Sequence, residues 1–272
     1  MKIEVIIPAY NCIDTLTTTL GSLIAQTDKD FYIHLIDDCS TQDLNPIINQ
    51  FKNLLNIKVT RNQENKGCGM SRQVGIDATD ADYIAFLDSD DVLMPYTVET
   101  WKAMINSHPE VDVFHSFFYE KSITKDGKFL LNLIQKGFTW MHGKIYKTSF
   151  IKYWGIRNSP EVKWADDSFF NSMCTELGTV GLIPVPTYCW LNNQNSITRN
   201  GSMRMNKGII DFAHAMKLSI EFVKSKGLKN IQHLPNTIKS IENKKEQYCS
   251  QSSEKEYQEL MDFLYRNLKE QE

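Results

Sequence analysis

Short apolar runs alternate with amphipathic segments along the first half of the chain. Residues 3–7 and 32–36 are mostly apolar and rich in β-branched side chains, which predicts two buried strands. Between them, leucines recur at helical spacing from Asp14 to Ile24, which predicts an amphipathic helix. A strand, a helix and a second strand in this order indicate a parallel βαβ unit.

The same alternation continues to about residue 120. A hairpin turn is expected after it at Asp126–Gly127. The other elements predicted in this half are, in chain order, a helix over 47–55, a strand over 57–60, a helix over 67–77, a strand over 83–87, a helix over 95–107 and a strand over 112–119.

The second half is predicted to hold one further strand and a helical end. A helix is expected over residues 164–177. Residues 181–190 are strand-like, but Pro184 and Pro186 have no N–H to donate, so this strand is expected at a sheet edge. From Lys207 onward the pattern is helical and polar.

Composition favours a folded α/β protein. The chain has 272 residues, of which 42% are hydrophobic, and can bury a core without disulfides or metals as staples. A stretch rich in Asn, Ser and Gly over 192–206 marks the weakest boundary. We therefore expect an α/β domain over residues 1–205 and a helical C-terminal extension over residues 206–272.

Charge and cysteine content narrow the class further. The 30 Lys and Arg residues against 33 Asp and Glu residues give a net charge of −3, so no overall positive field attracts polyanions, and nucleic acid is a disfavoured partner. The six cysteines form no CxxC pair, which predicts free thiols. The first apolar run stops at Pro8, too early for a signal peptide, and nothing approaches the ~20 apolar residues of a membrane span. A cytoplasmic protein is expected.

Polar residues follow three of the predicted strands. Asn11 follows the first strand, Asp37 and Asp38 end the second, and residues 88–91 follow the strand over 83–87. The carboxyl ends of parallel strands lie at one edge of a sheet, which is where open α/β sheets bind ligands. These side chains are therefore expected to converge on one site.

Each acidic group has two readings when taken alone. The carboxylates of Asp88, Asp90 and Asp91 repel one another, which a divalent cation would offset, but they could equally form a solvated turn. The pair Asp37–Asp38 could bind a base or ribose, or cap a helix. The pair Asp166–Asp167 could supply a general base beside aromatic residues, or favourable charge at a helix start.

The ordered set of motifs is more specific than any one of them. Pro8-Ala9-Tyr10-Asn11, Asp37-Asp38-Cys39-Ser40, Asn65-Lys66-Gly67 with Arg72, Asp88-Ser89-Asp90-Asp91 and Asp166-Asp167 follow one another over about 190 residues. In this order they resemble the family-2 glycosyltransferases of the GT-A fold. The resemblance implies a mostly parallel central sheet flanked by helices, and transfer of a sugar from a nucleotide-diphospho-sugar.

The resemblance also implies roles for individual residues. Asp166 is the expected catalytic base, with Asp167 as second candidate. Asp90 is the expected metal ligand, Asp88 a ribose or metal partner, and Asp91 a support for the turn. His142 has two readings, a donor or phosphate contact and a structural histidine beside Trp140. The pocket for the nucleotide-sugar is expected to include Pro8, Ala9, Tyr10, Asp37, Asp38, Asn65, Gly67, Arg72, Asp88, Ser89 and His142.

These roles define an expected activity. It is an inverting, single-displacement transfer from a nucleotide-sugar, taken to be UDP-linked, with Mg²⁺ or Mn²⁺, onto a surface glycan or a lipid-linked saccharide. The alternatives are an inactive sugar-nucleotide-binding module and a nucleotidyltransferase. A lysine-rich stripe over residues 217–245 has three possible interpretations. The ordinary one is a solvated helix face, and the two functional ones are peripheral contact with an anionic membrane and contact with a polyanionic acceptor such as modified DNA.

Overall fold

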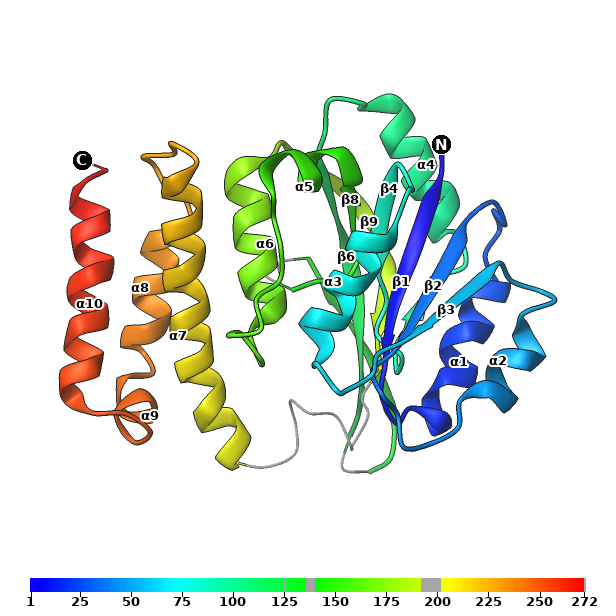
Figure 1. The fold of residues 1–272 in the computed structure, drawn as a ribbon, viewed down its shortest axis with the longest axis horizontal. Helices are drawn as coiled ribbons and strands as arrows, with labels where there is room; N and C mark the ends of the chain where they lie inside the picture. Colours follow the sequence, from blue (N-terminus) through cyan, green and yellow to red (C-terminus); the bar gives the residue numbers. More distant parts are fainter. Residues whose placement is uncertain (125, 136–139, 192–201, 272) are drawn as a thin grey trace.

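The computed structural model of the protein describes residues 1–124, 126–135, 140–191 and 202–271. Its first half is a set of parallel strands with helical crossovers, as predicted (Figure 1). The strands are β1 (Ile3–Ala9), β2 (Tyr32–Asp37), β3 (Ile57–Arg61) and β4 (Tyr83–Phe86). The helices are α1 (Ile13–Ile24), α2 (Asn45–Phe51) and α3 (Cys68–Ala78).

The second half of the sheet is mixed. Its strands are β5 (Val92–Leu93), β6 (Val113–Ile123), β7 (Phe129–Ile134), β8 (Lys144–Lys147) and β9 (Val180–Trp190). Helices α4 (Thr97–Ser107), α5 (Thr148–Trp154) and α6 (Asp166–Leu177) belong to this half. Among the described residues the sheet order is β3-β2-β1-β4-β8-β6-β9-β5, with β7 paired to β6.

One prediction about the sheet holds only for part of a strand. Among the described residues, the proline-containing part of β9 pairs with β6 alone, as expected of an edge, but its C-terminal end also pairs with β5 on the other side. The sheet tolerates Pro184 and Pro186 through a register shift, in which Ser116 faces Ile183 and Phe117 faces Pro186. β5 pairs only with Cys189 and Tyr188, beyond the prolines, so no ladder hydrogen bond to β5 is lost.

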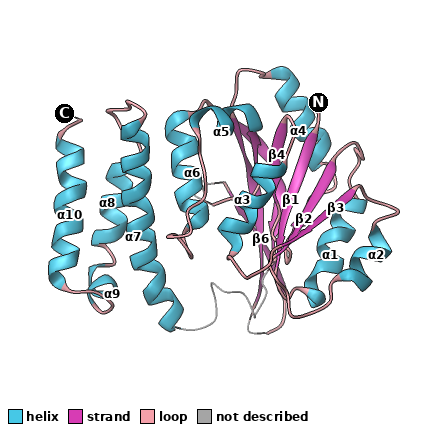
Figure 2. Cartoon of the chain, in the orientation of Figure 1, coloured by secondary structure: helices cyan, strands magenta, loops and turns pink. Residues whose placement is uncertain are grey.

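Both faces of the sheet are covered, which explains why β1 is apolar on both faces apart from Glu4. Every residue of β1 is buried. Val5 and Ile7 point into the hydrophobic cluster that contains the buried residues of α1, α2 and α4, whereas Ile6 points into the cluster on the opposite face. Figure 2 shows α1 and α2 on one side of the strands and α3 and α6 on the other. The predicted α/β architecture is confirmed.

The C-terminal helices continue the core beyond α6. They are α7 (Ser202–Ser225), α8 (Leu234–Glu242), α9 (Lys245–Cys249) and α10 (Glu254–Lys269). Their buried side chains share one hydrophobic cluster with Phe169, Phe170 and Met173 of α6. The buried Glu176 carboxylate of α6 also accepts hydrogen bonds from the backbone N–H groups of Gln232 (2.9 Å) and His233 (2.8 Å), just before α8. The helical C-terminal region that was predicted is therefore present, and it packs on α6 (Figure 1).

All six cysteines are free. None of the helices in the described ranges combines the length and the apolar content needed to cross a bilayer.

The Glu176 contact gives a pH-dependent contribution to stability. Although burial opposes its ionisation, hydrogen bonds from His233 and the neighbouring N–H group hold the pKa of Glu176 below its ordinary 4.5. Its stabilising effect is therefore complete above pH 4.5 and is lost as the pH falls through the lower folded-state pKa. Glu176→Gln should lower the free energy of unfolding by about 2 kcal/mol at pH 7, because an amide cannot accept all these donors.

Urea unfolding at a series of pH values measures this effect. The gap between wild type and Glu176→Gln should narrow as the pH falls below 4.5. Glu259→Gln, which removes an exposed partner of Lys255 on α10, is the control and should change stability by less than about 0.5 kcal/mol. If the two proteins differ little in their free energy of unfolding at pH 7, or if the difference grows in acid, the Glu176 carboxylate does not stabilise the contact with the start of α8.

Candidate functional site

The exits of β1 and β2 are joined by side-chain hydrogen bonds. The backbone N–H of Asn11 donates to Ser40 Oγ at 3.0 Å. Asn11 and Cys39 have positive φ values of 48° and 61°, which non-glycine residues rarely adopt and which are enriched at functional sites. Of the predicted residues here, Ala9 is buried in β1 and Tyr10 is exposed, so the Tyr10 ring is the group that can contact a ligand.

Pro8 is likewise buried within β1. Its place opposite Ile36 of β2 makes it part of the sheet rather than of an open surface.

Asp38 holds the loop that leads to α3. Its Oδ1 accepts from Asn62 Nδ2 at 2.7 Å and from the N–H of Lys66 at 2.9 Å, and its Oδ2 accepts from the N–H of Gly67 at 2.8 Å. The side-chain amide of Asn65 donates to the carbonyl oxygen of Asp38 at 3.4 Å. Since a carboxylate oxygen has two lone pairs, Oδ2 retains capacity for one further donor. The contact with a nucleobase stays a prediction.

Asp37 has a structural environment of its own. Its carboxylate accepts from the N–H of Ser40 at 2.9 Å and forms an ion pair with Arg61. Arg61 also donates to the carbonyl oxygen of Ser40 at 2.8 Å. These contacts fix the turn after β2, and a contact of Asp37 with a nucleotide likewise stays a prediction.

Arg72 of α3 joins two of the predicted acids. Its side chain is buried, with Nη2 2.6 Å from Asp88 Oδ1 and Nη1 2.5 Å from Asp166 Oδ2. Residues 72, 88 and 166 are far apart in the sequence, yet the fold brings all three into one ionic group. Burial opposes the ionisation of Asp88, but the Arg72 charge keeps its pKa below the ordinary 3.8.

The first turn of α6 carries Asp166 and Asp167. Burial raises the pKa of Asp166, and Arg72 only partly reverses this. Burial and the neighbouring Asp166 raise the pKa of Asp167 to about 7. A carboxyl group poised near neutrality is suited to take up a proton in a reaction at physiological pH.

Gly69 allows α3 and α6 to approach closely at this point. A Cβ atom on Gly69 would lie 2.7 Å from Asp166 Cβ and 3.1 Å from Asp166 Oδ2. Gly67, which precedes α3, has a φ of 83° that requires glycine. The two glycines therefore serve different purposes, one for the turn and one for the contact with Asp166. Gly67 was predicted as a pocket residue, whereas the close contact of Gly69 with Asp166 was not predicted from the sequence.

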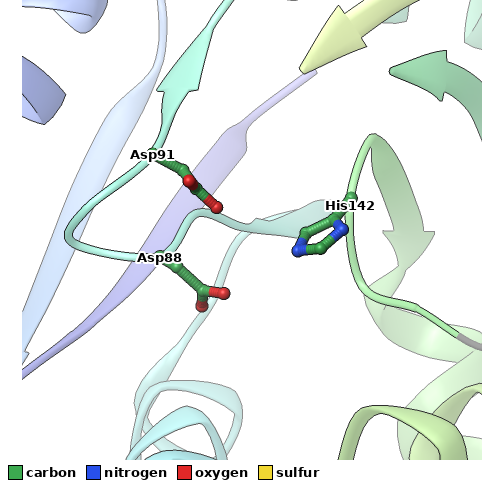
Figure 3. Close-up of side chains that lie close together, drawn as sticks. All are labelled: Asp88, Asp91 and His142. Atoms are coloured by element: carbon green, nitrogen blue, oxygen red, sulfur yellow. The ribbon is translucent and has the colours of Figure 1, made fainter. Parts of the chain in front are cut away.

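Asp88, Asp91 and His142 form a group able to hold a cation (Figure 3). One potential ligand atom from each lies within 4.8 Å of the others. Among the described residues, His142 Nδ1 is buried and has no hydrogen-bond partner. Burial, opposed by Asp88, lowers the pKa of His142 to about 4, so its ring is neutral at pH 7 and able to coordinate a metal. Two carboxylates and an unpartnered imidazole fit a divalent cation.

Asp91 and His142 are also held by their surroundings. Asp91 accepts from Tyr188 Oη at 2.6 Å and from the N–H of Leu191 at 2.8 Å, which agrees with a supporting role in the turn. The His142 ring stacks on Trp190 at 5.3 Å between ring centres and lies 4.9 Å from Tyr188. Asp88 and His142 were both expected in the pocket, but a cation-binding group that joins them with Asp91 was not predicted.

Among the described residues, Asp90 and Ser89 are not members of this group. Ser89 accepts a hydrogen bond from Thr15 Oγ1 through its carbonyl oxygen at 2.9 Å. Half-buried Asp90 lines a cavity of about 240 Å³ together with Asp14 of α1 and Lys121 of β6. Of the predicted metal pair, Asp88 belongs to the cation-binding group and Asp90 lines this cavity. The role of both as metal ligands stays a prediction.

Comparisons with known proteins identify the family of the chain. Residues 4–164 match the family described as glycosyl transferase family 2. The chain is 30% identical to the poly(ribitol-phosphate) beta-N-acetylglucosaminyltransferase TarS of Staphylococcus aureus over 182 aligned residues. The aligned segment covers 62% of this chain and 32% of TarS. It is also 32% identical to the UDP-Glc:alpha-D-GlcNAc-diphosphoundecaprenol beta-1,3-glucosyltransferase WfaP of Escherichia coli over 127 aligned residues. This segment covers 47% of this chain and 50% of WfaP. The chain thus aligns with half or less of these two relatives.

Solved structures show the same fold. The crystal structure of S. aureus TarS 1–349 in complex with UDP-GlcNAc has a TM-score of 0.65 and 22% identity, over 89% of this chain and 80% of that chain. The complex of the same fragment with UDP has a TM-score of 0.62 and 21% identity, and the match covers 100% of this chain and 88% of that chain. The predicted fold is therefore confirmed.

The close contact at Gly69 predicts a loss of stability on substitution. Gly69→Ala forces α3 or α6 to shift, which should lower the free energy of unfolding by about 1–3 kcal/mol. Gly21→Ala in α1 is the matched control, since its Cβ would meet nothing within 4 Å and should raise stability by about 0.5–1 kcal/mol through helix propensity. Chemical denaturation compares the two variants, and equal stabilities would mean that α3 and α6 are not closely packed at Asp166.

Proposed function

The chain belongs to glycosyl transferase family 2, and we propose that it transfers a sugar from a UDP-linked donor to an acceptor hydroxyl by a metal-assisted single displacement with inversion. The observation that carries the proposal is the burial of Arg72 between Asp88 and Asp166 at the carboxyl edge of the parallel strands. It places an acid of the predicted nucleotide and metal site beside an acid suited to be a base.

The donor assignment is supported by the relatives. WfaP is named for UDP-Glc, and the TarS structure contains UDP-GlcNAc. In this chain the exposed Tyr10 ring directly after β1 offers a surface for a base, and Asp38 Oδ2, directly after β2, retains capacity for one further donor. Asn65, Gly67 and Ser89 belong to the loops around these groups.

Asp166 is proposed as the base that takes the proton of the acceptor hydroxyl. It lies at the first residue of α6 and contacts Nη1 of Arg72, whereas Asp88 contacts Nη2 of the same guanidinium. A carboxylate in this position can face an acceptor while Asp88 faces the donor. Its raised pKa brings its proton affinity closer to what a reaction at neutral pH requires. Asp167, the next residue, is the second candidate.

A divalent cation, Mg²⁺ or Mn²⁺, is proposed at Asp88. When bound, such an ion stabilises the negative charge that develops on the departing nucleoside diphosphate. Two sets of ligands are possible beside Asp88. In the first, Asp90 is the other ligand; in the second, Asp91 and His142 are the other ligands. An imidazole ligand would favour Mn²⁺ over Mg²⁺.

The acceptor is proposed to be a surface glycan or a lipid-linked saccharide. TarS is named for poly(ribitol-phosphate) and WfaP for a diphosphoundecaprenol-linked sugar. The alternative of a polyanionic acceptor such as modified DNA has less support, because two lysines of the C-terminal stripe already form ion pairs. Lys224 pairs with Glu270 at 2.5 Å and Lys245 with Glu254 at 2.6 Å.

The base assignment is tested by separating turnover from binding. Asp166→Asn should lower turnover of a UDP-sugar by at least about 100-fold, because the amide cannot accept the acceptor proton. The affinity for UDP, measured by calorimetry with Mn²⁺, should change less than threefold. Asp262→Asn on α10 is the control and should match wild type. Wild-type turnover in Asp166→Asn together with a collapse in Asp167→Asn would move the role to Asp167.

The metal site is tested by the dependence of UDP binding on Mn²⁺. Asp88→Asn should remove that dependence, so that UDP binds equally weakly with and without the ion. Asp14→Asn, which alters a carboxylate of the cavity beside Asp90, should retain it. Asp90→Asn and His142→Ala then identify which set of ligands completes the site. Retention of the dependence in Asp88→Asn would exclude Asp88 as a ligand.

A further inference from the structure

Three successive backbone N–H groups before α6 converge on one carboxylate of α7. Asp211 Oδ2 accepts from Ala165 at 2.8 Å, from Trp164 at 2.7 Å and from Lys163 at 3.1 Å, and the Lys163 N–H also lies 3.1 Å from Oδ1. Asp211 lies outside residues 4–164, the range matched by the family. The contact therefore involves a part of the chain that the family motifs do not include.

The contact anchors the backbone directly before α6. Ala165 is the N-cap residue of α6 and has no side chain able to accept a hydrogen bond. Asp211 instead accepts from the N–H of Ala165 itself and from the N–H groups of the two residues before it. A negative charge near a helix start is also favourable, and Asp211 supplies it from a different helix beside this cap residue.

The next residue after this cap is Asp166. Its carboxylate reaches Arg72 only if α6 begins at the observed position, with Asp166 Cβ against Gly69. The three hydrogen bonds to Asp211 fix where the backbone enters the helix. A shift of this entry would move the carboxylate away from the acceptor hydroxyl, and a 1 Å displacement of a catalytic group can cost ~100-fold in rate.

Asp211 itself is carried by a rigid part of the core. Ala213 and Met216, on the following turns of α7, are buried in the same hydrophobic cluster as Phe169 and Met173 of α6. Ser172 Oγ of α6 also lies 3.6 Å from Met216 Sδ. The carboxylate is therefore held by packed helices rather than by a loop.

We propose that Asp211 is a positioning residue that orients Asp166 for proton transfer, so that the C-terminal helices contribute to catalysis without contacting the donor. This inference rests on the proposed role of Asp166 as the base. It predicts a defect in turnover rather than in nucleotide binding.

The experiment compares Asp211→Asn, Asp166→Asn and Glu161→Gln in UDP-GlcNAc and UDP-glucose turnover and in UDP binding. Glu161→Gln is the matched control, because Glu161 joins the same loop to α7 through an exposed contact with His214 at 3.3 Å. Asp211→Asn should lower kcat roughly tenfold, with KM for the donor and UDP affinity within twofold of wild type. Glu161→Gln should match wild type in all three quantities.

Each contrary outcome has one meaning. If Asp166→Asn loses turnover and Asp211→Asn keeps it, the inference fails while the proposed function stands. Wild-type turnover in Asp166→Asn overturns the base assignment and the inference together. Equal losses of kcat and UDP affinity in Asp211→Asn would show a general structural role.

Hydrogen exchange of the wild-type protein tests the contact even if Asp211→Asn does not fold. The amides of Lys163, Trp164 and Ala165 should exchange at least about tenfold more slowly than those of the exposed residues Gln63 and Glu64. Equal exchange rates would show that the hydrogen bonds to Asp211 do not hold the loop and would overturn the inference.

Discussion

The arrangement of the site depends on one buried cation, the guanidinium of Arg72. It neutralises Asp88 from the turn after β4 and Asp166 from the start of α6, which would otherwise be carboxylates buried close to each other. Burial of such charges is costly unless they are paired, and loss of one partner of a buried pair typically costs ~3–5 kcal/mol. The same residue therefore holds the two sides of the site together and sets the charge between them.

This ionic group also explains why the site is at the edge of the sheet. The parallel strands β1, β2 and β4 deliver their carboxyl ends to one edge, and α3 then returns from β3 to place Arg72 behind the turn after β4. The antiparallel strand β8 and the long strand β9 enclose the other side, where His142 stacks against Trp190. Rigid elements thus surround the acids on several sides, which favours a preorganised site.

The sequence was informative wherever the signal was local. The apolar runs of β1, β2 and β4 and the acids that follow them could be predicted, because buried strands and polar exits repeat within short windows. The pairing of the C-terminal end of β9 with β5 could not, since it begins only beyond Pro184 and Pro186 and joins segments almost 100 residues apart. Asp91 and Asp211 act through partners about 100 and 46 to 48 residues away, and no spacing rule reveals such contacts.

The central claim is that acids from distant motifs gather around one cation and one activated sugar. A crystal structure of the protein with UDP and Mn²⁺, with the ion located by anomalous scattering, tests it most directly. The account predicts Mn²⁺ at ~2.1 Å from a carboxylate oxygen of Asp88 and in contact with the diphosphate, with the Asp166 carboxylate facing the open side of the same cleft. UDP and Mn²⁺ bound at another place, or Asp166 turned away from the cleft that holds them, would contradict it.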